Sequence, residues 1–382
     1  MPQAAVETNV ADALGLVTAV DVTATESLPP FANTAMDGFA VRSADLGTIP
    51  VQLEVVETIA AGHSPVQSVG PGQASRIMTG APIPDGADAI VMVEKTSIDG
   101  ETVTIEAQVE RGNHIRPAGD DVSKGDLVFP IGTRLTAGHL GVLCSLGLQE
   151  IQTYPRLRVG VMSTGDELVD DGGHLEPGQI RDSNRRTLLS LLSGDAFMPV
   201  DLGLIADDEQ AIEEALTQGA HDCDAVITSG GVSMGDFDYV KKVLDRIGDM
   251  RWMQIAIKPA KPLAFGTISG TPIFGLPGNP VSSMVSYELF ARSGLRSMMG
   301  FKEPIRPAIK GIAGEALGRR TDGKIHYARV IAEHENGATV VYPVSGQGSH
   351  MLASMARSNA LAVLPDGEGF EAGEQLDVLL LN

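Results

Sequence analysis

The stretch that decides the fold is Arg158-Val159-Gly160-Val161-Met162-Ser163-Thr164-Gly165, and residues 224–231, Asp-Ala-Val-Ile-Thr-Ser-Gly-Gly, repeat its character. Each is a short apolar and β-branched run that ends at glycine, as expected for a strand buried on both faces of a parallel sheet. Residues 207–219 and 240–247 then carry apolar residues at helical spacing. Strand, glycine turn and helix in repetition predict a doubly wound α/β domain over residues 156–303, with its site at the carboxyl ends of the strands.

The segments on either side of this domain are richer in strand signals. From residue 51 to about residue 110 the chain contains short β-rich runs separated by Gly, Pro and Asp turns, which predict a small β-rich domain. Residues 304–382 have no comparable helical periodicity and predict a small β domain or barrel. A chain of 382 residues exceeds what one hydrophobic core usually spans, so several domains are expected.

Composition narrows the function classes. Lys and Arg total 28 against 49 Asp and Glu, and the net charge of -21 disfavours broad binding to nucleic acids or anionic membranes. Two cysteines in the whole chain exclude a disulfide framework and a zinc ribbon. No apolar run approaches the ~20 residues of a membrane helix, and the first basic residue is Arg42, so we expect a cytoplasmic protein without a signal peptide.

Two motifs at predicted strand ends combine glycine with hydroxyl and carboxylate side chains. Residues 163–168, Ser-Thr-Gly-Asp-Glu-Leu, offer donors to a phosphate and carboxylates for a hard cation, although a plain Asx-turn explains them equally well. Residues 229–239 place three glycines before Asp236 and Asp238, which are candidate Mg²⁺ ligands or a helix N-cap. Neither stretch is a GxGxxG or a Walker motif, which disfavours nicotinamide cofactors and a conventional ATPase.

Two further stretches supply cations and a helix start. Lys258-Pro259-Ala260-Lys261-Pro262 holds two lysines beside prolines, and in residues 275–283 Asn279 suits an N-cap and Pro280 the first helical position. Both are suited to an anion, and a solvated lysine face is the alternative. Arg181-Asp182-Ser183-Asn184 is explained by a helix N-cap. By themselves, residues 33–40, 76–82 and 116–121 are interpreted as ordinary turns.

Taken in order, these motifs resemble those of the molybdopterin molybdenumtransferases, the MoeA-type family that shares its fold with the C-terminal domain of gephyrin. The resemblance covers nearly the whole chain. It implies that residues 1–30 pair with residues 125–155 as domain I, and that 31–124, 156–303 and 304–382 form domains II, III and IV. It also implies a homodimer whose active cleft lies between the α/β domain of one subunit and the inserted domain of the other.

The resemblance further implies a reaction in which molybdate is inserted into the dithiolene of adenylylated molybdopterin, with Mg²⁺-assisted release of AMP. The catalytic residues would be Glu167, Asp238, Lys258 and Lys261, with Glu167 and Asp238 at the metal. The substrate-binding residues would be Asp37, Thr79, Asp121, Ser163, Thr164, Asp182, Gly230, Gly231, Ser233, Pro262, Pro277, Pro280, Ser282, Arg329, Ser349 and Ser354. Expected partners are a molybdopterin adenylyltransferase and acceptor molybdoenzymes.

The chain departs from the family pattern at several positions. Ala260 stands where the family often has glycine, so a positive φ there would strain the loop. The N-terminal part is expected to be short, and the position near Leu16, often arginine in the family, is apolar.

Two other functions compete with the transferase. They are a non-catalytic scaffold of the same fold, as gephyrin's clustering role illustrates, and a general nucleotide pyrophosphohydrolase.

Overall fold

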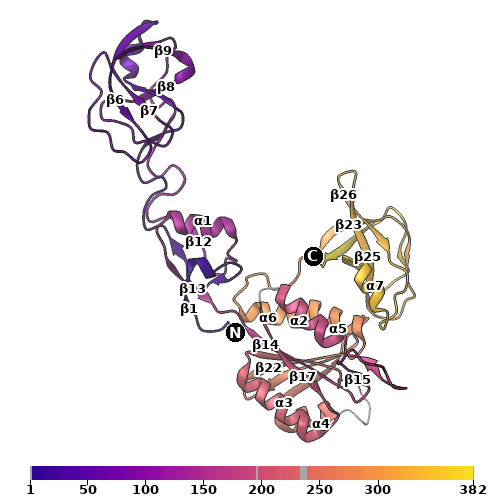
Figure 1. The fold of residues 1–382 in the computed structure, drawn as a ribbon. Helices are drawn as coiled ribbons and strands as arrows, with labels where there is room; N and C mark the ends of the chain where they lie inside the picture. The colour runs from indigo at the N-terminus through magenta and orange to yellow at the C-terminus, as the bar shows by residue number, and fades with distance from the viewer. Residues whose placement is uncertain (1, 195–196, 233–238, 382) are drawn as a thin grey trace. The chain divides into compact units, whose positions relative to one another are not determined.

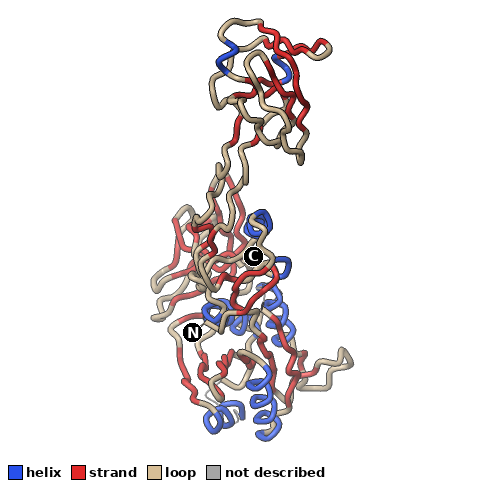
Figure 2. The backbone as a smooth tube through the Cα atoms, turned by 90° about the vertical axis from the view of Figure 1, so that its left-hand side faces the viewer, coloured by secondary structure: helices blue, strands red, loops and turns tan. Residues whose placement is uncertain are grey.

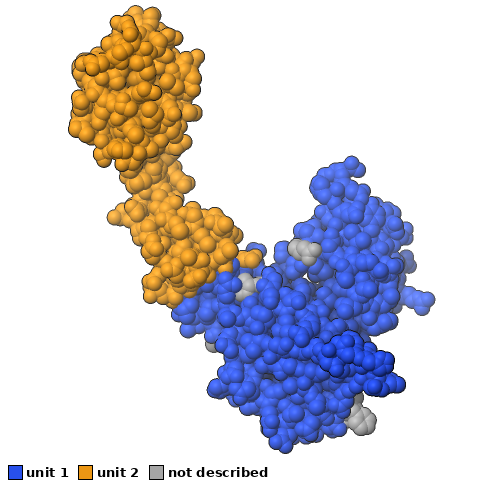
Figure 3. Space-filling model, viewed as in Figure 1, with its two compact units in different colours: residues 1–6, 15–17, 153–382 blue, residues 7–14, 18–152 orange. Residues whose placement is uncertain are grey.

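The computed structural model describes residues 2–194, 197–232 and 239–381 (Figure 1). The chain divides into two compact units, coloured separately in Figure 3. Unit 1 comprises Met1–Val6, Gly15–Val17 and Thr153–Asn382, and unit 2 comprises Glu7–Leu14 and Thr18–Gln152. The four domains expected from the sequence divide the chain more finely, and their boundaries stay a prediction.

A six-stranded sheet forms the centre of unit 1, in the order β17-β14-β18-β22-β21-β19. The first four strands run parallel, whereas β21 and β19 continue the sheet antiparallel. The predicted strands are confirmed at β14 and β18. The bounds are Arg158–Thr164 for β14, Met198–Ile205 for β17, Ala225–Ser229 for β18, Asp249–Gln254 for β19, Pro262–Ile268 for β21 and Thr271–Leu276 for β22.

Helices cover both faces of this sheet, which confirms the α/β class (Figure 1). Because successive strand side chains point to opposite faces, Val161 packs under α2 and α6 while Met162 packs under α3 and α4. Both faces are therefore apolar, as the unalternating strand sequences predict. The bounds are Asn184–Gly194 for α2, Glu209–Asp222 for α3, Tyr239–Ile247 for α4, Pro280–Ser286 for α5 and Arg292–Met298 for α6, with the π-helix η4 at Tyr287–Ala291.

The C-terminal part of unit 1 is a closed β-barrel. Its strands pair in the order β25-β26-β23-β29-β27, and β27 also pairs with β25, which closes the ring. Strand β20, from the α/β part of the chain, adds to β25 in parallel. The bounds are Ile257–Lys258 for β20, Ile309–Ala313 for β23, Ile325–Glu335 for β25, Ala338–Pro343 for β26, Ala360–Leu364 for β27 and Gln375–Leu380 for β29, with helix α7 at Leu352–Arg357.

Unit 2 contains a six-stranded sheet in the order β8-β5-β7-β6-β10-β9. Figure 2 shows this region as mostly strand and loop, in agreement with the prediction of a β-rich insert. Buried residues such as Phe39 and Val103 form its core. The bounds are Gly38–Val41 for β5, Val51–Ile59 for β6, Gln73–Ile77 for β7, Ala89–Met92 for β8, Thr96–Asp99 for β9 and Thr102–Ile105 for β10.

The remainder of unit 2 packs around helix α1, Ala137–Ser145, which contributes buried Leu143 to a separate apolar cluster. In unit 1, Leu16 is 4% exposed and packs with Leu157 and Val159, so the apolar residue at this position is a core residue. None of the helices in the described part of the chain has the length and apolar character needed to cross a bilayer.

One glycine after β18 is required by sterics. Gly231 has φ +71, and a Cβ placed there would lie 2.3 Å from Val240 Cβ. We expect Gly231→Ala to lower the free energy of unfolding by about 3 kcal/mol, from left-handed backbone strain plus overpacking. Gly270, with φ +91 and no atom within 4 Å of a built Cβ, is the matched control. Gly270→Ala should cost about 1 kcal/mol in urea unfolding, and equal losses would show that the Val240 contact is not the reason for glycine at 231.

Candidate functional site

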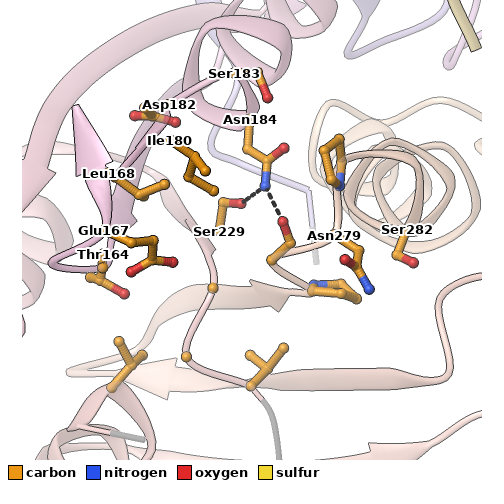
Figure 4. Close-up of a pocket in the computed structure, with 18 of the residues that line it drawn as sticks. Thr164, Glu167, Leu168, Ile180, Asp182, Ser183, Asn184, Ser229, Asn279 and Ser282 are labelled. Carbon is orange, nitrogen blue, oxygen red and sulfur yellow. Dashed lines mark hydrogen bonds between the residues drawn. The ribbon is translucent and has the colours of Figure 1, made fainter. Parts of the chain in front are cut away.

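A pocket of about 670 Å³ lies at the carboxyl ends of β14, β18 and β22 (Figure 4), the edge at which the sequence predicts the site. Three loops enclose it, one after each strand, together with the start of α2 and of α5. Its lining residues are Thr164, Gly165, Glu167, Leu168, Ile180, Arg181, Asp182, Ser183, Asn184, Asp207, Ser229, Gly230, Gly231, Val232, Tyr239, Val240, Pro262, Pro277, Gly278, Asn279, Pro280, Ser282 and His350.

Many of the predicted binding residues line this pocket. They are Thr164, Glu167, Asp182, Gly230, Gly231, Pro262, Pro277, Pro280 and Ser282. Ser163 is 1% exposed and lies behind the wall, where its hydroxyl donates to Asp182 Oδ1 at 3.1 Å. The predicted residues Ser233 and Asp238 lie outside the described residues.

Asp182 is held by an ion network. Arg185, 3% exposed, donates from Nε to Asp182 Oδ2 at 2.9 Å, and its other nitrogens bond to Asp201 and Asp170. Burial alone would lower the pKa of Arg185, but the hydrogen bonds to Asp201 and Asp182 raise it above its ordinary range. The Arg185 amide also donates to Asp182 Oδ1 at 3.2 Å, so this carboxylate accepts a hydrogen bond from the first turn of α2.

Asn184 is a pocket residue that the sequence reasoning missed. Its Nδ2 donates to Ser229 Oγ at 2.8 Å and to the Gly278 carbonyl at 2.7 Å (Figure 4). Ser229 and His350 were likewise not singled out, and His350 reaches the pocket from the C-terminal barrel. The available signal for Asn184 was its place at a helix start directly after a strand-end motif, but its partners are 45 and 94 residues away in sequence.

Residues 258–262, the lysine loop, pack against the barrel. Ala260 is 2% exposed and has φ 74, so the left-handed backbone considered from the sequence is present with alanine in it. It packs with Val281 and Val285 of α5 and with Met355 of α7. The two lysines on either side, Lys258 and Lys261, are exposed. The loop therefore lies where α5, α7 and the barrel meet.

Arg329 of β25 is a buried cation that forms no ion pair with the residues that the structure describes. It is 1% exposed, its Nη2 donates to the Gly346 carbonyl at 2.8 Å, and its Nε and Nη1 have no hydrogen-bond partner in the described part of the chain. Burial lowers the pKa of its guanidinium. Since Gln347 Nε2 bonds to the Arg329 carbonyl at 2.9 Å and its Oε1 to the Arg329 amide at 3.0 Å, the strand is fixed beside this residue.

Three predicted serines lie near the junction of α5 with the barrel. Ser282 lines the pocket, the Ser349 carbonyl accepts from the Val281 amide at 3.1 Å, and Ser354 is fully buried with its hydroxyl donating to the Met351 carbonyl at 2.7 Å. Asn279 occupies the N-cap position and Pro280 the first turn, as predicted, although the Asn279 side chain makes no capping hydrogen bond.

Unit 2 holds the remaining three predicted residues. Asp37 accepts from the Thr79 amide and hydroxyl, both at 2.6 Å. These bonds, the hydroxyl contribution being the larger, hold the pKa of the Asp37 carboxyl below its ordinary value. Asp121 is exposed and lies after β11 (Ile115–Arg116), with its amide donating to the Leu28 carbonyl at 3.0 Å. The structure thus brings Asp37 and Thr79 together.

The chain matches known proteins along nearly its whole length. Family models match at residues 1–147 (MoeA N-terminal region, domain I and II), 160–297 (probable molybdopterin binding domain) and 319–381 (MoeA C-terminal region, domain IV). The molybdopterin molybdenumtransferase of Haemophilus influenzae is 38% identical, covering 97% of this chain and 92% of that protein. Molybdopterin molybdenumtransferase 2 of Mycobacterium tuberculosis is 41% identical, covering 96% and 92%. The crystal structure of the molybdopterin biosynthesis moeA protein from Pyrococcus horikoshii has a TM-score of 0.84 at 28% identity, covering 99% and 94%.

Because Ala260 has a left-handed backbone, its replacement by glycine should change the free energy of unfolding unusually little. Ala260→Gly relieves a left-handed alanine, worth about 1–2 kcal/mol, but loses a buried methyl and adds chain entropy to the unfolded state. We expect the free energy of unfolding to change by less than about 0.5 kcal/mol. Ala291, fully buried at φ -62, is the matched control, and Ala291→Gly should cost about 2 kcal/mol. Equal losses in urea unfolding would contradict strain at Ala260.

The Asp37 carboxylate offers a test by titration. Thr79→Val removes the hydroxyl donor and leaves the amide donor, so the pKa of Asp37 should rise toward its ordinary value, while Thr79→Ser should keep it low. Carboxyl ¹³C NMR titration of Asp37 measures this. An unchanged titration in Thr79→Val would mean that the hydroxyl bond does not lower the pKa.

Proposed function

The chain belongs to the molybdopterin molybdenumtransferase family, and we propose that it inserts molybdate into adenylylated molybdopterin with release of AMP. Its place in molybdenum cofactor biosynthesis and its transferase class follow from membership, since relatives of that name align over 96–97% of the chain. The adenylylated form of the substrate, the AMP product and the roles of individual residues are the content of the proposal.

The observation that carries the proposal is Arg329. A guanidinium that is 1% exposed and has two nitrogens without partners in the described residues gains most from an anion, because burying an unpaired charge is costly. Molybdate is a small dianion with four acceptor oxygens and satisfies such donors through charge-assisted hydrogen bonds. Lys258 of β20 pairs with His326 of β25, the strand that also carries Arg329. The lysine loop therefore adjoins the sheet that carries Arg329.

The pocket at the strand ends suits the adenylate half of the substrate. Thr164 supplies a hydroxyl, and Gly230 and Gly231 hold positive φ angles that bring the backbone close to a ligand. Ser282 and His350 connect this pocket to the region of the barrel. Ser163 would act indirectly: it lies behind the pocket wall and its hydroxyl holds Asp182, so it does not touch the nucleotide.

The pocket chemistry fits Mg²⁺. The described residues contain no cluster of three metal-ligating side chains, but Mg²⁺ in phosphate-transfer sites is commonly held by one or two carboxylates, water and the substrate phosphates. Glu167 lines the pocket and would be one ligand, with Asp238 as the second proposed from the sequence. When bound, the ion would shield phosphate charge. Lys258 and Lys261 would offset the negative charge of molybdate.

We also propose a homodimer, a cellular location and the proteins that deliver the substrate and receive the product. In a homodimer, Asp37, Thr79 and Asp121 of one subunit would complete the cleft of the other, and the low pKa of Asp37 keeps that carboxylate ionised as a fixed acceptor. A cytoplasmic location, delivery of substrate by a molybdopterin adenylyltransferase and transfer of product to molybdoenzymes belong to the same proposal. A net charge of -21 supports dependence on local cations for binding these anions.

Release of AMP from adenylylated molybdopterin, with and without molybdate, tests the function. We expect AMP release that requires molybdate and Mg²⁺. Arg329→Met should reduce the molybdate-dependent rate about a hundredfold. Because it removes an uncompensated buried charge, it should also raise the free energy of unfolding by about 1–3 kcal/mol.

Three results would contradict this view. Release of AMP from simple dinucleotides without molybdate would favour the pyrophosphohydrolase, and tight binding without any release would favour the scaffold. A loss of stability in Arg329→Met would identify the guanidinium as a structural tie to the Gly346 carbonyl, and Arg329→Lys, which keeps the charge, would then show whether activity depends on charge alone.

A further inference from the structure

We infer that Asn184 is a positioning residue of the nucleotide pocket, whose amide sets the spacing of the two loops that hold the ligand. The inference rests on the proposed function and deepens it, because it assigns nucleotide affinity to a side chain that the strand-end motifs do not include.

Both hydrogens of Asn184 Nδ2 are used. One bonds to Ser229 Oγ at 2.8 Å and the other to the Gly278 carbonyl at 2.7 Å (Figure 4). Ser229 is the last residue of β18, and Gly278 lies two residues past the end of β22. These strands are neighbours, with Ser229 opposite Leu276, so one amide from the start of α2 joins the ends of two adjacent parallel strands.

The two strands also pair through their backbones up to Ser229 and Leu276. Gly230 donates its amide to the Leu276 carbonyl at 3.1 Å, and a Cβ built on Gly278 would lie 3.7 Å from Gly230 Cα. Because glycines have no side chains that interlock, Asn184 adds a side-chain bridge beyond the ladder, from Ser229 to the Gly278 carbonyl. Both glycines also line the pocket.

The bond to Gly278 has an electrostatic effect as well. A backbone carbonyl is a strong acceptor, and a free carbonyl beside a phosphate would repel its oxygens. In the described part of the chain the Gly278 carbonyl accepts its hydrogen bond from Asn184. Loss of this donor would leave the carbonyl oxygen unpaired next to an anionic ligand, which costs binding free energy without removing any direct ligand contact.

Calorimetric titration of the full-length protein with AMP tests the inference. Asn184→Ala should weaken AMP binding about tenfold and Ser229→Ala about threefold, as expected for two and one lost hydrogen bonds. The double variant should be no weaker than Asn184→Ala, because both changes remove the same contact. In turnover, Asn184→Ala should raise KM for adenylylated molybdopterin about tenfold and change kcat less than about threefold.

Asn359 provides the matched control. Its side chain also ties two backbone groups, the Ala332 amide at 2.7 Å and the Ala332 carbonyl at 2.9 Å, but it lies in the barrel and does not line the pocket. Asn359→Ala should lower the melting temperature and leave AMP affinity unchanged. If it weakened AMP binding as much as Asn184→Ala, the effect would be general loosening and the positioning role would be wrong.

The outcomes separate the two proposals. Wild-type protein that fails to bind AMP would overturn the nucleotide assignment in the proposed function. Wild-type binding with unchanged affinity in Asn184→Ala would overturn the positioning role alone. Additive effects of the two substitutions would also overturn it. If Asn184→Ala does not fold, Ser229→Ala decides the question, since it leaves α2 intact and unchanged AMP affinity in that variant contradicts the inference.

Discussion

The burial of Arg329, a positively charged side chain with no carboxylate partner among the described residues, is the constraint on which the proposed site depends. Two of the buried arginines are of opposite kinds. Arg185 is surrounded by Asp170, Asp182 and Asp201, whereas Arg329 is equally buried and its guanidinium, among the described residues, donates to the Gly346 carbonyl alone. The first arrangement is complete by itself and stabilises a wall. The second has no carboxylate partner in the described part of the chain, and in the proposed function it would bind the oxyanion in a protein of net charge -21.

The rest of the site depends on where a parallel sheet ends and a barrel begins. Strand ends deliver Thr164 and Ser229 to one edge because parallel strands share a direction. The barrel then meets this edge through small, specific contacts, of which the Val281 amide to the Ser349 carbonyl is one. In the proposed function, this junction would bring the nucleotide end of the substrate to the pocket and its molybdenum-accepting end to the barrel.

Local patterns in the sequence predict local structure well in this chain. The unalternating apolar runs identify β14 and β18, and the spacing of Val240, Val243 and Leu244 identifies α4, because burial on both faces or on one face leaves a periodic trace. Asn184 leaves no such trace. Its role depends on two strand ends that approach it only in the folded protein, and its motif is interpreted from the sequence as a helix N-cap. The glycine-like φ of Ala260 was anticipated from a family pattern, since nothing in the alanine itself indicates it.

The short strand β20 has a consequence for how the parts of unit 1 are linked mechanically. Lys258 belongs by sequence to the α/β region, yet its strand, β20, pairs in the barrel sheet with β25, the strand that carries Arg329. Rotation of the barrel as a rigid body would therefore carry Lys258 along with Arg329 and leave the nucleotide loops behind. In the proposed function, the side chains that bind the oxyanion would therefore keep their mutual spacing as members of one sheet, whatever the distance of that sheet from the nucleotide pocket.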